Sequence, residues 1–211
     1  MGYSKDGILG DFRGRVGNLV MYQMHGKTVV RIRPAGRSGK PSPALKAAQG
    51  DFARVMGVMR KMKWFVRTGF YFVAEGRSPF HQALSENLLR YRAAEEKDDL
   101  KWLLLSRGTR AGALDAACSI GDEYVDISWG APEEGKPWAD DDQAMVVATN
   151  NTTLLMAGSL SAGPRSNGHA RVRRPPTGAG EEVRVFLAFR CALPTPGGKD
   201  IENVSESVVV G

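Results

Sequence analysis

The second half of the chain alternates between short apolar segments and turn residues, and this pattern constrains the fold more than any other feature. Polar residues separate Val125, Ile127 and Trp129, and the segment 183–190 alternates in the same way. A period of two indicates strands that bury one face. The strand candidates are 100–106, 116–120, 124–129, 144–149, 154–160, 170–174, 183–190 and 204–210. Seven or eight strands in about 110 residues are typical of an antiparallel β-sandwich of immunoglobulin-like size.

Helical spacing precedes these strands. Ser42 and Pro43 suit the N-cap and the first position of a helix. Apolar residues then recur every three or four positions, which predicts a long amphipathic helix over 43–68 that Gly50 and Gly57 weaken.

A second helix begins with the same signal, at Ser78 and Pro79, and ends near the charged run 95–99. Its buried face consists of apolar residues at helical spacing. These are Phe80, Leu84, Leu88 and Tyr91.

The N-terminal segment 7–34 contains a predicted β-hairpin. A two-residue turn at His25-Gly26, with glycine supplying a positive φ, places Met21 opposite Val30 and Leu19 opposite Ile32. These four side chains form one wholly apolar face. An isolated two-stranded hairpin is marginal in water, so this face must bury against something.

Glycines recur every three or four residues upstream of the hairpin, at Gly7, Gly10, Gly14 and Gly17. Glycine is a poor helix former, so the spacing predicts turns or bulges where backbones approach closely. The segment after the hairpin, 35–43, is a turn-rich basic linker.

Charge is divided unevenly along the chain. The net charge of the 211 residues is +6, but residues 1–92 carry +12 and residues 93–211 carry −6. A basic half attracts nucleic acid, an anionic surface or the acidic half of a neighbouring copy.

The basic residues form two groups, one on the hairpin and linker and one at the end of the first predicted helix. The candidate interaction residues are Arg13, Arg15, Tyr22, Lys27, Arg31, Arg33, Arg37 and Lys40 in the first group, and Arg60, Lys61, Lys63, Trp64 and Arg67 in the second. Interleaved cations and aromatic rings suit single-stranded nucleic acid, although no recognised nucleic-acid motif accompanies them. They equally suit an acidic protein surface, such as that of an adjacent subunit.

Residues that could support catalysis or metal binding are scattered. The three histidines are far apart in sequence, and the acidic run Asp140–Asp142 lacks the alternating pattern of a calcium loop. We expect that run to be a solvated loop in which one aspartate caps a turn. The sequence contains no nucleophile elbow and no phosphate-binding loop. We therefore expect no catalytic site, no metal, no cofactor and no small-molecule substrate.

The sequence also bears on the compartment. No secretory signal and no membrane-spanning run is evident, so a cytoplasmic location is the default, with export by another route left open. In that compartment Cys118 and Cys191 are expected to be reduced, buried thiols, with a bridge between neighbouring strands as the alternative.

Five segments of the sequence resemble the blocks of a known family in order and spacing. They are ILGDFRGRVGNLVMYQMHGKTVVRIRP, PSPALKAAQGDFARV, LLLSRGTRAGA, WADDDQAMVVATN and NVSESVVVG. The chain resembles an uncharacterised family of Bacteroidota proteins with a domain of unknown function, over residues 8–211. The resemblance implies homology over nearly the full length, and it supplies no activity and no site residues. The chain departs from the pattern at Asp11, at 22–24 and at 70–72.

Together these features predict an α+β protein in three parts: a glycine-rich hairpin arm (1–34), a basic linker with a helical pair (35–99) and an antiparallel sandwich (100–211). The expected function is that of a non-enzymatic structural or assembly protein. Such a protein would self-associate or dock a protein partner through its basic arm. The alternative is a nucleic-acid-binding protein that uses the basic N-terminal half.

Overall fold

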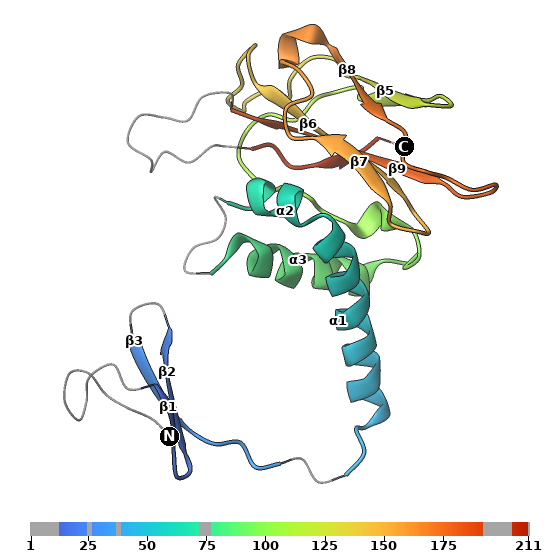
Figure 1. The fold of residues 1–211 in the computed structure, drawn as a ribbon. Coiled ribbons are helices and arrows are strands. Elements are labelled where there is room, and N and C mark those ends of the chain that lie inside the picture. The colour runs from blue at the N-terminus through green and yellow to red at the C-terminus, as the bar shows by residue number, and fades with distance from the viewer. Residues whose placement is uncertain (1–12, 25–26, 37–38, 72–76, 192–203, 211) are drawn as a thin grey trace. The chain divides into compact units, whose positions relative to one another are not determined.

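The computed structural model shows a mixed α+β fold, as the sequence predicts (Figure 1). It divides into two compact units, Met1–Pro43 and Ala44–Gly211. The residues that the structure describes are 13–24, 27–36, 39–71, 77–191 and 204–210. Within them lie three α-helices and three antiparallel sheets.

The first unit contains a three-stranded antiparallel sheet, here called the arm sheet. Its order is β1 (Gly14–Val16), β2 (Leu19–Met24) and β3 (Lys27–Ile32). In β2 and β3, Met21 lies opposite Val30 and Leu19 opposite Ile32, so the predicted register is confirmed. The predicted hairpin therefore gains one further strand, β1, which the sequence did not reveal.

Two glycines with a positive φ lie at the start of β1 and in the turn between β1 and β2. Gly14 has a φ of 123° and Gly17 a φ of 56°, a region that side chains with a Cβ rarely adopt. The predicted role of the glycines in turns or bulges is thus confirmed at these two positions. Gly7, Gly10 and the predicted turn at His25-Gly26 lie outside the described residues.

Three α-helices open the second unit: α1 (Pro43–Lys61), α2 (Lys63–Gly69) and α3 (Pro79–Ala93). The single helix predicted over 43–68 is broken at Met62, whose φ of −97° and ψ of 22° depart from helical values. Apolar spacing continues across the break, so the periodicity did not reveal it. Over the described residues, no helix has the length and apolarity that crossing a membrane requires.

The predicted cap of α3 is confirmed. The Ser78 hydroxyl accepts a hydrogen bond from the backbone N–H of His81, and Pro79 occupies the first turn. The predicted buried face also holds, because Leu84 and Tyr91 are buried while Phe80 and Leu88 pack against the same core.

Two antiparallel sheets complete the second unit. The first has the order β10 (Val208–Val209), β9 (Val183–Arg190), β6 (Gln143–Asn150) and β7 (Met156–Ser159). The second has the order β4 (Ala117–Ile120), β5 (Tyr124–Ser128) and β8 (His169–Arg173). Seven of the eight strand candidates correspond to these strands.

The second unit has three layers (Figure 1). The two sheets enclose one apolar core, in which Ile127 from β5 meets Val146 and Leu187 from β6 and β9. The helices cover the opposite face of the four-stranded sheet, where Met145 and Phe186 join the second core. Strands β6 and β9 are therefore buried on both faces, which accounts for their nearly uninterrupted apolar sequences.

The predicted strand 100–106 is wrong. A short 3₁₀ helix, η1 (Leu100–Trp102), is followed by a buried segment without ladder pairing. Side chains satisfy its backbone instead: Asn87 bonds both backbone groups of Leu104, and the Ser207 hydroxyl accepts from the N–H of Leu105 at 2.9 Å. The segment is apolar because it is buried.

Candidate interaction surfaces

The apolar face of the arm sheet is exposed. Antiparallel partners lie on the same face of a sheet, so Val16 joins Leu19 and Ile32, with Met21 and Val30 beside them. The exposed fractions are 46% for Val16, 38% for Leu19, 52% for Val30 and 75% for Ile32. This set (Val16, Leu19, Met21, Val30 and Ile32) is called the apolar arm face. It contains the predicted apolar set and extends it by one residue.

The opposite face of the arm sheet is basic. Arg15 and Arg31 both pair with Val20, so the two arginines flank one valine on a single face. The guanidinium of Arg31 lies 5.5 Å from the centre of the Tyr22 ring, within the range of a cation–π contact. Alternation along the strands thus gives the sheet one apolar and one cationic side.

The other predicted arm residues are exposed, apart from one that the structure does not describe. Arg13, Lys27, Arg33 and Lys40 are exposed, and the backbone of Arg33 continues the sheet by donating to the Asn18 carbonyl at 2.7 Å. Arg37 lies outside the described residues. The structure therefore brings Tyr22, Arg15 and Arg31 together.

A second surface lies at the junction of α1 and α2. All five predicted residues of this group are exposed, with Trp64 at 72%, and Tyr71 just beyond α2 is 64% exposed. Arg60 and Lys61 end α1, Lys63, Trp64 and Arg67 lie in α2, and Tyr71 follows two residues after the end of α2. This set, together with the two lysines, is called the Trp64 surface. Its members are Arg60, Lys61, Lys63, Trp64, Arg67 and Tyr71.

The cations of the Trp64 surface differ from most others in the second unit. Elsewhere in that unit many cations pair with acids, as in Arg107–Glu86 and Arg171–Asp126. Among the described residues, Arg60, Lys61, Lys63 and Arg67 form no ion pair and no hydrogen bond through their side chains. Four cations without a partner among the described residues therefore lie within four positions of one exposed indole in the sequence.

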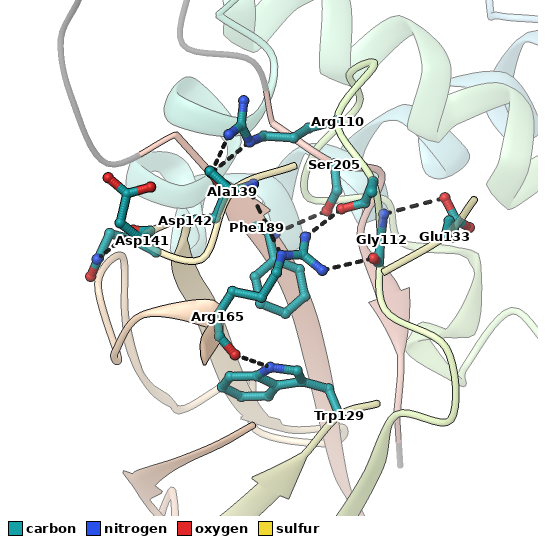
Figure 2. A network of polar contacts seen from close by, with 12 residues as sticks. Arg110, Gly112, Trp129, Glu133, Ala139, Asp141, Asp142, Arg165, Phe189 and Ser205 are labelled. Atoms are coloured by element: carbon teal, nitrogen blue, oxygen red, sulfur yellow. Dashed lines mark hydrogen bonds and ion pairs between the residues drawn. The ribbon is translucent and has the colours of Figure 1, made fainter. Parts of the chain in front are cut away.

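A buried polar network lies at one end of the sandwich, and the sequence did not predict it (Figure 2). Asp142 is fully buried and receives Nε of Arg110 at 2.6 Å and the backbone N–H of Ala139 at 3.0 Å. Nε of Arg165 lies 3.7 Å from the second carboxylate oxygen. One buried carboxylate thus joins two arginines from separate loops.

Both the guanidinium and the backbone carbonyl of Arg165 make close contacts. Its guanidinium donates to the carbonyl oxygens of Ala111 at 2.6 Å and Gly112 at 2.9 Å, and lies 3.6 Å from the centre of the Phe189 ring. Burial lowers the pKa of this guanidinium below its ordinary value. The indole N–H of Trp129 donates to the Arg165 carbonyl (Figure 2). These contacts connect separate loops of the second unit.

The network corrects part of the prediction for the acidic run. Asp140 and Asp141 are exposed, as a solvated loop requires, but Asp142 is a buried ion-pair partner. It also caps the local turn, since it accepts from the N–H of Ala139, as expected of one aspartate in the run. Within the described part of the chain, no cluster of three or more His, Cys, Asp or Glu residues could hold a metal ion.

The histidines and cysteines have local roles. Nδ1 of His81 lies 2.9 Å from the Ser78 hydroxyl, and Nδ1 of His169 lies 2.9 Å from the Asn167 carbonyl. Cys118 and Cys191 are free and half-buried, so the disulfide alternative is wrong. Burial raises the pKa of the Cys118 thiol, which makes its reactive thiolate scarcer.

Comparison with known proteins identifies the family. Residues 11–211 match DUF6266, a family of unknown function, and the chain belongs to this family. The resemblance to an uncharacterised family is thereby confirmed over nearly the full length. No curated protein and no solved structure matches the chain.

Proposed function

We propose that this member of DUF6266 is a non-enzymatic assembly protein that associates with further copies of itself through its N-terminal arm. The observation that carries the proposal is the apolar arm face. Four of its side chains are more than a third exposed on a sheet of only three short strands. A single sheet has no core of its own, so it gains stability by covering its apolar side.

Charge favours another copy of the chain as the partner. The first unit carries eight Lys and Arg residues against two Asp, a net charge of +6. The whole chain has the same net charge, so the second unit is balanced overall, and its portion 93–211 carries −6. A basic arm that meets the acidic portion of the next copy forms a head-to-tail contact, which builds rings or filaments.

The remaining parts of the proposal rest on the sequence and on the arrangement of strands. The non-enzymatic assignment is supported by the lack of a catalytic signature in the sequence. The immunoglobulin-like interpretation of the sandwich is supported by the packing of one four-stranded and one three-stranded antiparallel sheet.

Sedimentation velocity over a range of protein concentrations tests the proposal. We expect the native chain to form assemblies and the double variant Val30→Thr, Ile32→Thr to dissociate. Threonine retains the β-branched shape that suits a strand, while it removes apolar area from the face. Loss of about 2 kcal/mol of burial raises the dissociation constant about 30-fold.

Val29→Thr is the matched control, because Val29 lies on the same strand and points to the opposite face. It should leave the assembly unchanged. A native chain that stays monomeric at every concentration and salt level would refute the proposal. Equal assembly of the double variant and the native chain would refute the assignment to this face.

A further inference from the structure

We infer that the Trp64 surface binds single-stranded nucleic acid. The inference is independent of the assembly proposal, because it concerns α1 and α2 and not the arm sheet. It narrows the broad possibility of a nucleic-acid-binding basic half to the exposed residues at the junction of two helices. The geometry combines an indole that is 72% exposed with four cations that have no partner among the described residues.

Each component matches a chemical feature of a single strand. Lysine and arginine neutralise the phosphate backbone, while an exposed aromatic ring offers a platform on which an unpaired base can stack. A second exposed ring, Tyr71, lies two residues beyond the end of α2. A duplex keeps its bases stacked on one another, so it can use the cations but not the rings.

The burial of neighbouring residues argues against a membrane surface as the ligand. A helix that lies in a membrane interface needs a free apolar face to insert among the lipid chains. Here Met62, Phe65 and Val66 are buried in the protein core. Trp64 is an exposed ring with Lys63 beside it and Arg67 three positions on, which suits stacking better than insertion.

The size of the surface sets the expected strength. The four cations lie within eight consecutive residues, across the end of α1 and most of α2, so the surface covers a few nucleotides. Four phosphate contacts give a slope of about −3 for the logarithm of the association constant against the logarithm of salt concentration. Stacking on an indole contributes about 1 to 3 kcal/mol per base, so losing Trp64 weakens binding at least about fivefold.

Fluorescence anisotropy of a labelled 20-nucleotide oligothymidine, titrated with the full chain at 20 mM NaCl, tests the inference. We expect Trp64→Ala to weaken binding at least about fivefold. Its control is Trp138→Ala, which removes an indole that is 48% exposed on the sandwich and should change nothing.

A second pair of variants tests the cations. Lys61→Ala with Lys63→Ala should reduce the steepness of the salt dependence by about 1.4, which corresponds to two phosphate contacts. Lys46→Ala with Arg173→Ala removes the same charge from two other exposed positions and should leave the slope unchanged.

Three outcomes would overturn the inference. They are no binding at low salt, equal binding by the Trp64→Ala and Trp138→Ala variants, and binding to a 20-base-pair duplex as tight as to the single strand. Retention on anionic vesicles or acidic peptides without oligonucleotide binding would assign the surface to another ligand class. Sedimentation of Trp64→Ala should match the native chain, which keeps this test separate from that of the arm.

Discussion

Asn87 is the residue whose replacement should reveal most about the second unit. It lies in α3 and is fully buried. Its side chain makes the two backbone hydrogen bonds of Leu104 that a neighbouring strand would make in a sheet. Its amide nitrogen donates to the Leu104 carbonyl at 2.9 Å, and its amide oxygen accepts the Leu104 N–H at 2.7 Å. Both backbone groups of a buried residue therefore depend on one side chain.

Asn87→Leu has a similar size and removes both hydrogen bonds. Each buried backbone group left without a partner costs about 1 to 3 kcal/mol. Two such groups give a loss of about 4 kcal/mol in the free energy of unfolding. The third bond, from the Asn87 amide to the Ala83 carbonyl at 3.0 Å, adds little, because that carbonyl also accepts a bond within the helix.

Urea unfolding followed by circular dichroism measures this loss. With a denaturant dependence of about 2 to 3 kcal/mol per molar, the midpoint should fall by about 1.5 M. Ser85→Leu is the control, because Ser85 is exposed on the same helix and its replacement should change stability by less than about 0.5 kcal/mol.

A loss below about 1 kcal/mol for Asn87→Leu would refute this account, since two buried groups cannot lose their partners at so small a cost. It would mean that water or a shift of the segment satisfies Leu104. A large loss for both variants would place the effect in the helix itself.

Two further predictions concern an ion pair and two glycines. Arg184 donates to both carboxylate oxygens of Asp99, at 2.7 and 3.0 Å, and together with Lys101 it lowers the Asp99 pKa from 3.8 to about 2. The two cations therefore contribute about 2 kcal/mol above pH 4, the larger part from Arg184, and this is lost as the pH falls towards 2, so the thermal stabilities of Arg184→Met and the native chain should approach each other at low pH. Gly57→Ala should raise stability by about 1 kcal/mol in urea unfolding, because its site in α1 is open. Gly69→Ala should lower stability by about 2 to 3 kcal/mol, because its Cβ would lie 2.2 Å from the Leu105 carbonyl oxygen; equal effects of the two would contradict both.

The parts of the fold that the sequence predicted depend on residues that are close together in the sequence. The hairpin register followed from two alternating segments joined by a two-residue connection, which fixes the pairing. The start of α3 followed from the serine and proline at its cap. By contrast, the three residues of β1 are too few to show a period, and Gly14 conceals the strand further.

The features that the sequence did not predict depend on residues that are far apart in the sequence. The segment after η1 is apolar and extended, yet the groups that satisfy it belong to Asn87 and Ser207, and Ser207 lies about a hundred positions away in sequence. The ion pairs of Asp142 with Arg110 and Arg165 likewise join separate loops. No periodicity or spacing encodes such contacts, so only the assembled fold reveals them.

For the two candidate surfaces, part of the arrangement could be predicted from the sequence and part could not. Cations are mostly exposed, so composition alone was enough to predict that the basic residues lie at the surface. The two rings beyond α2 differ in burial: Tyr71 is 64% exposed, whereas Phe70 is fully buried. The sequence identified an aromatic cluster, and the structure shows which ring is exposed.

The register of the arm sheet links its structure to the proposed function. In β3, Arg31 stands between Val30 and Ile32, so the two faces differ only because the pairing with β2 is fixed. A slip by one residue in β3 would move Arg31 onto the apolar face and Ile32 onto the basic one. Docking through apolar contact would then bury a guanidinium without a partner, at a cost that outweighs the gain. The family match begins at residue 11 and therefore includes this sheet, so the pairing that keeps the two faces distinct belongs to the inherited fold.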